Sequence, residues 1–178
     1  MVIVDERDYI FYGKHAKMVR ALSTYFDVQN KYRFFENDLQ IYILAPIVGV
    51  LYNRVAPISK DDAMMVAIAL QDLNAQKVQI AYNFKLIMLV IDKESLCSKE
   101  RVDRAFSGYY DPVQKGVMVD RYNEYVRGGV EVLHEKLIVN SDGDYMQSLY
   151  KFLFELNNRY YKELSSEEIV AMAMSYDY

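Results

Sequence analysis

Apolar residues recur at every third or fourth position along most of this chain, the spacing that marks one face of an α-helix. An alternating apolar and polar pattern, which would indicate strands, is not evident in any long segment. The pattern therefore predicts an all-α protein, an irregular bundle of about six or seven helices, with no strand other than an extended N-terminal arm. Five of the helices are expected at residues 7–26, 39–54, 98–106, 122–137 and 146–160.

The segment between residues 61 and 91 contains neither Gly nor Pro, the residues that most often end a helix. Its apolar positions, among them Val66, Leu70 and Ile80, also follow a helical spacing. Two interpretations fit: one helix, or two helices joined near Asn74. We favour one long, bent helix.

Residues 39–52 are apolar on nearly every side, so we expect them to form the central and most buried helix. Pro46 interrupts this segment, and it either kinks the helix or begins a second one. Gly49 costs about 1 kcal/mol of helix propensity, and we expect it to let a neighbouring helix approach closely. Gly128 and Gly129 are expected to permit a close crossing or to kink their own helix.

The composition is that of one folded domain spanning residues 1–178. Hydrophobic residues make up 52% of the chain and charged residues 26%, which is too apolar for a disordered protein. Only 7 Gly and 3 Pro interrupt it, which favours long helices over a fold with many turns. Residues 165–178 are expected to add a short C-terminal helix, because Ser165 and Glu168 have the spacing of a capping box.

The net charge of −4 gives the chain no general attraction to nucleic acid or to anionic membranes. Its most apolar run, of about 14 residues, is too short to span a bilayer. Cys97 is the single cysteine, so no internal disulfide can form. A chain without disulfides and without a visible signal peptide is expected in the cytoplasm.

No motif for catalysis or for binding a metal or cofactor is recognisable. The chain has two histidines, His15 and His134, and neither belongs to a known catalytic spacing. Glu131 and His134 have the Glu-x-x-His spacing of di-iron bundles, but such sites need a second pair and two further Glu residues. Cys97 lacks an activation signature and is interpreted as an ordinary thiol. We therefore expect a protein that is not an enzyme and that has no cofactor and no small-molecule substrate.

Basic residues of the N-terminal third suggest one alternative function. Residues 1–60 carry 8 basic and 6 acidic side chains, the only positive balance in the chain. Three of the basic residues are spaced by three along a predicted helix and so share one side of it. Aromatic residues that could stack on bases lie among them in the sequence. The candidate nucleic-acid-binding residues are Lys14, Lys17, Arg20, Lys31 and Arg33.

Tyrosine is unusually frequent, with 17 residues and no Trp. Tyrosine is enriched at protein interfaces because it combines a large apolar area with a polar tip. Residues 140–178 carry 3 basic and 7 acidic side chains, so an aromatic, acidic C-terminal region is expected to pack on the protein's own core or to bind another chain. The candidate partner-binding residues are Tyr160, Tyr161, Tyr176 and Tyr178.

Residues 14–57 resemble small helical accessory proteins of bacterial DNA phosphorothioation and related phage-defence gene clusters. The resemblance rests on Lys14-His15-Ala16, on the apolar run that ends at Ala45, and on Gly49, Arg54 and Pro57. In those proteins a similar apolar-Ala-x-x-x-Gly helix is followed by an Arg and a Pro. The resemblance implies a non-catalytic subunit that acts with a DNA-handling complex, and it transfers no functional residue.

The leading functional hypothesis is a non-enzymatic helical adaptor that binds another protein or a second copy of itself. The first alternative is a nucleic-acid-binding accessory protein that uses the basic residues of the first helix. The second is a small helical enzyme with an unrecognised site built from carboxylates or tyrosines. No membrane association is expected under any of the three.

Overall fold

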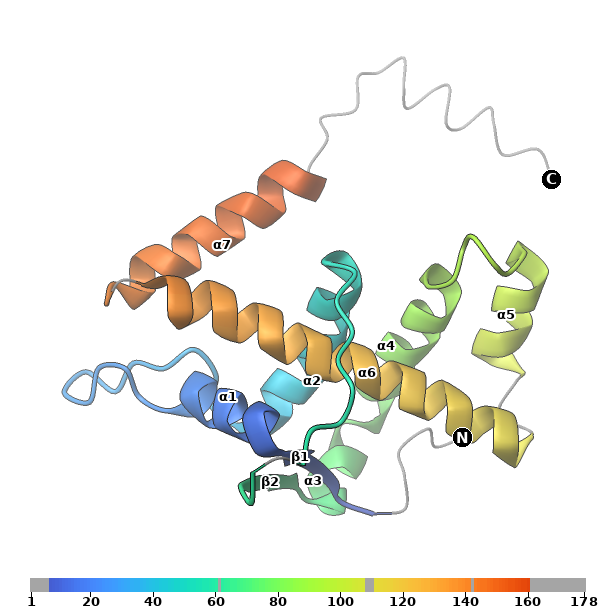
Figure 1. Cartoon of the computed structure of the whole chain (residues 1–178), viewed down its shortest axis with the longest axis horizontal. Helices are drawn as coiled ribbons and strands as arrows, with labels where there is room; N and C mark the ends of the chain where they lie inside the picture. Colours follow the sequence, from blue (N-terminus) through green and yellow to red (C-terminus); the bar gives the residue numbers. More distant parts are fainter. Residues whose placement is uncertain (1–6, 61, 108–110, 142, 161–178) are drawn as a thin grey trace.

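The computed structural model describes residues 7–60, 62–107, 111–141 and 143–160 (Figure 1). Within these ranges the chain forms seven α-helices, one 3₁₀ turn and one two-stranded sheet, which confirms the prediction of a helical bundle. In chain order the elements are β1 (Tyr9–Tyr12), α1 (Gly13–Ser23), α2 (Asp38–Leu51), β2 (Met65–Ile68), α3 (Leu70–Ala75), α4 (Lys77–Val90), α5 (Ser98–Phe106), α6 (Pro112–Leu137), the 3₁₀ turn η2 (Val139–Ser141) and α7 (Tyr145–Tyr160).

The expectation that residues 7–26 form one helix is wrong in its first part. Residues 9–12 are strand β1, and α1 begins only at Gly13. Phe11 is buried while Ile10 and Tyr12 on either side of it are half-buried, so the strand turns alternate side chains toward the core. Gly13 has a φ of 53°, a left-handed conformation that Gly adopts without strain, and this allows the chain to change from strand to helix.

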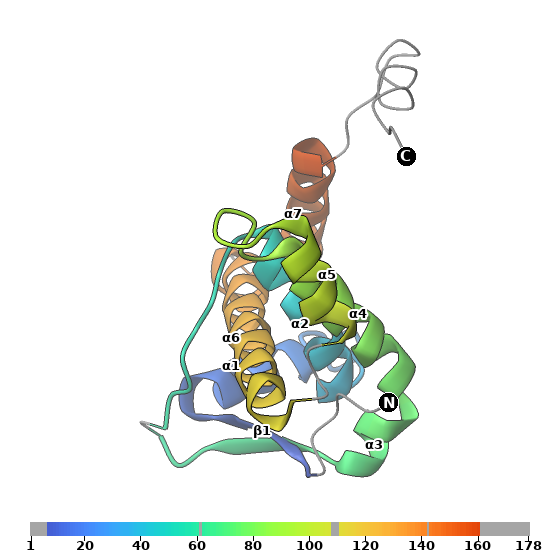
Figure 2. The same ribbon diagram turned by 90° about the vertical axis from the view of Figure 1, so that its right-hand side faces the viewer.

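The expectation of one long helix between residues 61 and 91 is also wrong. Residues 65–68 form β2, which pairs with β1 in antiparallel register, with Tyr9 opposite Ile68. The helical part of this segment is two helices, α3 and α4, that meet at Gln76. Figure 2 shows the small sheet along one edge of the molecule, on the opposite side of α6 from α7.

The centre of the fold is the crossing of α2 and α6, and glycines set its distance. A Cβ on Gly129 would overlap the backbone oxygen of Ala45, and a Cβ on Gly49 would overlap that of Tyr125. The close approach predicted from these glycines is therefore confirmed. Ala45 and the α6 residues Val126 and Val130 are completely buried at this crossing.

The segment that follows α2 and includes Arg54 and Ala56, called the crossing segment below, passes over α6 (Figure 1). The backbone of Arg54 comes so close to Gly128 that a Cβ there would overlap it. Ala56 donates its N–H to the carbonyl of Glu124 at 3.1 Å, and Arg127 Nε donates to the carbonyl of Ala56 at 2.8 Å. These contacts hold α6 between α2 on one side and the crossing segment on the other.

The predicted central helix α2 is buried or half-buried around most of its circumference. Ile41 and Val48 of α2 are buried, and Pro46 lies inside one continuous helix, so it does not begin a second one. Of its 14 residues, only Gln40, Leu44 and Leu51 are exposed, which confirms the expectation that this helix is covered on most sides. None of the helices in the described ranges is both long enough and apolar enough to cross a membrane.

Candidate functional site

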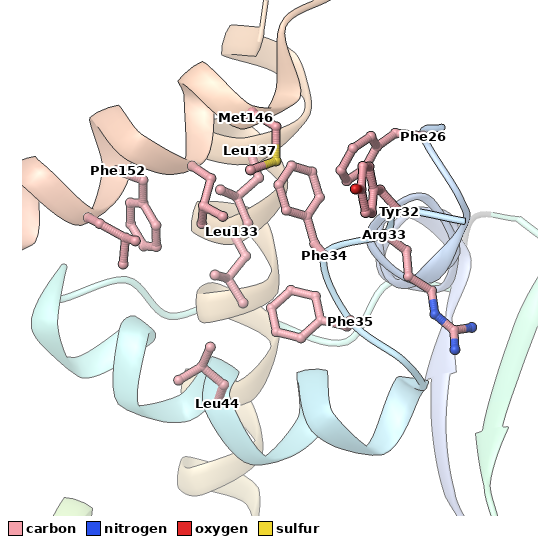
Figure 3. A pocket seen from close by; sticks show the side chains of 12 residues that line it. Phe26, Tyr32, Arg33, Phe34, Phe35, Leu44, Leu133, Leu137, Met146 and Phe152 are labelled. Carbon is pink, nitrogen blue, oxygen red and sulfur yellow. The ribbon is translucent and has the colours of Figure 1, made fainter. Parts of the chain in front are cut away.

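An apolar cavity of about 490 Å³ lies where α7 meets the loop between α1 and α2 (Figure 3). Residues of α6 and α2 form its floor, and its remaining side opens to solvent. Leu133 and Leu137 of α6 are almost completely buried, so the floor is closed from below. The cavity is lined by Phe26, Tyr32, Arg33, Phe34 and Phe35 of the loop, Leu44 of α2, Leu133 and Leu137 of α6, and Met146, Leu149, Phe152 and Leu153 of α7.

Helix α7 forms one wall of the cavity. Its apolar side chains cover more of the helix surface than the face that packs against the core. Phe152 is buried in the core, whereas Met146 and Leu153 are 60% and 55% exposed. Tyr150 and Phe154 continue the exposed apolar surface, and their rings stack with centroids 6.2 Å apart. We call these four exposed side chains, Met146, Tyr150, Leu153 and Phe154, the α7 face. A contiguous exposed apolar surface beside a cavity is typical of a binding site.

The opposite wall is an ordered aromatic cluster in the loop. Phe26 packs on Phe34 at 4.9 Å between ring centroids and stacks on Tyr145 of α7 at 5.0 Å. Phe26 and Tyr32 are also joined through their backbones, by a hydrogen bond of 3.0 Å from the N–H of Phe26 to the carbonyl of Tyr32. Hydrogen bonds from the backbone and side chain of Asn30 fix the turn and lower the pKa of Asp27.

The basic residues predicted to bind nucleic acid fall on two elements. Those of α1 are each close to a carboxylate: Lys14 Nζ lies 2.8 Å from Glu131, Lys17 pairs with Asp62, and Arg20 lies 3.8 Å from Asp38. Lys31 and Arg33 instead belong to the loop that forms the cavity wall. Neighbouring carboxylates therefore balance the charges of the three basic residues of α1.

Glu131 is a junction between α6, α1 and the crossing segment. Its carboxylate accepts hydrogen bonds from Lys14, from His15 Nε2 at 3.2 Å and from Arg54 Nε at 3.2 Å. Burial alone would raise the pKa of Glu131, but the bonds from Lys14, His15 and Arg54 outweigh it and lower that pKa. The carboxylate is therefore ionised and accepts only, which places a proton on His15 Nε2.

His15 is 1% exposed, and its Nδ1 has no hydrogen-bond partner among the described residues. Burial lowers the pKa of His15, so the ring is neutral at neutral pH. A histidine this deeply buried cannot reach a substrate. We therefore interpret the hydrogen bond between His15 and Glu131 as a structural link between α1 and α6. His134, which is spaced from Glu131 like a metal ligand, takes no part in this cluster. No group of three or more metal-ligating side chains occurs in the described ranges.

The surroundings of Cys97 and of Tyr160 indicate a structural role for each residue. Cys97 is exposed at the start of α5, where its backbone N–H donates to the Glu100 carboxylate at 2.8 Å. The hydroxyl of Tyr160 donates to the carbonyl of Leu51 and so ties the end of α7 to α2. The other predicted partner-binding tyrosines, Tyr161, Tyr176 and Tyr178, lie outside the described residues, as does the helix expected at 165–178.

Sequence patterns did not reveal the cavity. Its lining comes from four segments between residues 26 and 153, and no local spacing signals that they meet. The apolar excess of α7 could have been found, because Met146, Leu149, Tyr150, Leu153 and Phe154 occupy more of the helix than one packing face needs.

Comparison with models of protein families finds none that fits this chain, and comparisons with curated proteins and with solved structures find no match either.

Proposed function

We propose that this protein is a non-catalytic helical adaptor that binds a segment of another protein in the cavity and along the α7 face. The observation that supports it is the cavity itself, which is apolar, open on one side and continuous with four exposed apolar side chains. Burying one large apolar side chain contributes about 1.5–3 kcal/mol. Several such side chains seated together would offset the entropy lost on association.

The lining favours a protein segment over a small molecule. Small-molecule sites usually combine apolar walls with several convergent polar groups that fix the ligand's orientation. Here Arg33 and the Tyr32 hydroxyl are the polar groups of the lining, and both belong to the loop. An elongated apolar surface beside a helix suits the side chains of a second helix, the mode in which amphipathic helices bind grooves.

The resemblance of residues 14–57 to accessory proteins of phage-defence clusters gives the proposal a context. On that resemblance, the bound protein would be a subunit of a DNA-handling complex. Direct binding of nucleic acid remains the alternative hypothesis, and a salt-dependent affinity for DNA or RNA that is lost on reversing the charges of the α1 lysines would support it.

Site-specific cross-linking in the native host tests the proposal. A photo-reactive amino acid is placed at Leu153, in the cavity wall, or at Val117 of α6, an apolar control that is at least as exposed and does not line this cavity. We expect position 153 alone to cross-link a distinct protein. The purified partner should then bind the full chain and lose at least tenfold in affinity for Leu153→Asp.

Leu153 is half exposed, so Leu153→Asp should keep the melting temperature of the parent chain. The proposal is overturned if position 153 cross-links no protein, if positions 117 and 153 cross-link the same set, or if Leu153→Asp binds the partner as tightly as the parent chain.

A further inference from the structure

We infer that the segment bound in the cavity is an amphipathic helix with acidic residues at the end that lies against Lys31 and Arg33. This inference rests on the proposed function and adds the chemistry of the partner. It follows from two features of the site: the charges on its rim and the kind of surface its walls offer.

The loop that forms the cavity wall carries two cations without acidic partners among the described residues. No carboxylate of the described ranges lies within 4.0 Å of Lys31 or Arg33, whereas Lys14, Arg20 and Arg54 of the same third of the chain are all paired. Lys31 is exposed, and it directly precedes Tyr32 of the cavity wall. Two unpaired positive charges beside an apolar surface favour a partner with acidic side chains there.

Arg33 is held in place for such a contact. Its guanidinium lies over the ring of Tyr25, 4.8 Å from the centroid. Figure 3 shows the stem of Arg33 beside the aromatic residues and its guanidinium at the edge, directed away from the apolar lining. A carboxylate could meet this group while the apolar side chains of the same segment enter the cavity.

The walls favour a helix over an extended strand as the partner. A strand would add to a sheet edge, and the one sheet of the described ranges lies on the other side of α6. The cavity walls present side chains from α7 and from the loop instead. Met146 and Leu153 are about 10 Å apart along α7 at 1.5 Å per residue. A partner helix of about three turns, with apolar residues at i, i+3 or i+4, and i+7, spans this distance.

Selection from a displayed peptide library tests the inference directly, because it lets the surface itself choose the sequence that binds. The library consists of three-turn helices that keep the apolar positions and carry random Asp, Glu, Lys, Arg, Ser or Gln at every other position. It is selected on the full chain and on three variants: Lys31→Glu/Arg33→Glu, Leu153→Asp, and Lys93→Glu/Lys99→Glu. The last is the matched control, because both of its lysines are exposed and belong to the connection before α5 and its first turn.

We expect the full chain and the control to enrich helices with Asp or Glu clustered at one end. The Lys31→Glu/Arg33→Glu variant should bind the selected acidic helices about tenfold more weakly, and 1 M salt should remove most of that difference. Since Arg33 is half-buried, Lys31→Glu alone is measured beside it. That single change at an exposed position should reduce affinity by about two- to fivefold.

The possible failures are distinct. Helices selected by the full chain but lost on Leu153→Asp, with no acidic bias, would overturn this inference and leave the proposed function standing. A selection no different from that on Leu153→Asp would overturn both. Self-association that Leu153→Asp abolishes would make a second copy of the chain the occupant, and it would also overturn the inference.

Discussion

Replacing Gly129 by Ala tests whether the close crossing of α2 and α6 controls the stability of this protein. At an open helical position, Ala in place of Gly raises the free energy of unfolding by about 1 kcal/mol, because Ala has the higher helix propensity. At Gly129 the added Cβ would overlap the carbonyl oxygen of Ala45. That oxygen belongs to a helix backbone and cannot rotate away. The structure therefore predicts a change of opposite sign.

The size of the effect follows from what must move. The two helices have to separate to make room for the added Cβ. Overpacking of this kind typically lowers the free energy of unfolding by about 1–3 kcal/mol, and occasionally by more. Separation also loosens Val126 and Val130, both completely buried at the crossing. We expect Gly129→Ala to lower the free energy of unfolding by about 3 kcal/mol or more. For a chain of this size, that corresponds to a fall in melting temperature of about 6–12 °C.

Gly116 provides the matched control on the same helix. A Cβ there would meet no atom within 4 Å, so Gly116→Ala should raise the free energy of unfolding by about 1 kcal/mol. Both variants are measured by denaturant unfolding followed by circular dichroism. The reasoning would be refuted if Gly129→Ala were as stable as the parent chain, or if both substitutions changed stability by the same amount.

Three further predictions concern buried groups. Val48→Asp should lower the free energy of unfolding by several kcal/mol in denaturant unfolding, because Val48 is 3% exposed and an unpaired carboxylate there is costly; Ile43→Asp, at a half-buried position, should cost clearly less, and equal losses would contradict the assigned burial. Asn83 donates to the carbonyl of Ile43 at 2.9 Å and links α4 to α2, so Asn83→Ala should lower the melting temperature through a loss of about 1–3 kcal/mol; an unchanged value would show that this bond contributes nothing. Burial lowers the pKa of His15, so below about pH 6.5 the unfolded chain binds more protons than the folded chain. The free energy of unfolding should therefore decline as the pH falls from about 6.5 toward the lowered pKa. His15→Gln should reduce the loss of unfolding free energy between pH 7.5 and 5.5. His134→Gln is measured as well, because burial also lowers the pKa of His134. A loss in His15→Gln identical to that of the parent chain would exclude His15 as its source.

The sequence by itself determined the helices that have long, regular apolar patterns. The pattern at 122–137 and 146–160 identified α6 and α7, although α6 begins ten residues earlier, at Pro112. Gly49 and Gly129 also indicated a close crossing correctly, because a glycine inside a strong helical pattern is unfavourable unless another backbone needs the space. Such signals are local, and they can be read without knowing what packs against the helix.

Tertiary structure alone decided the sheet, because each strand has four residues and too few alternations to compete with the helical spacing around it. β1 and β2 are strands only through pairing with each other across more than 50 residues of chain. The candidate site has the same origin: its walls come from α7 and a loop more than 100 positions apart in the sequence. Tertiary structure also decides which basic side chains have an acidic partner. Lys14 and Arg20 look like free cations in the sequence, but α6 and α2 supply Glu131 and Asp38 beside them. No carboxylate of the described residues lies within 4.0 Å of Lys31 or Arg33.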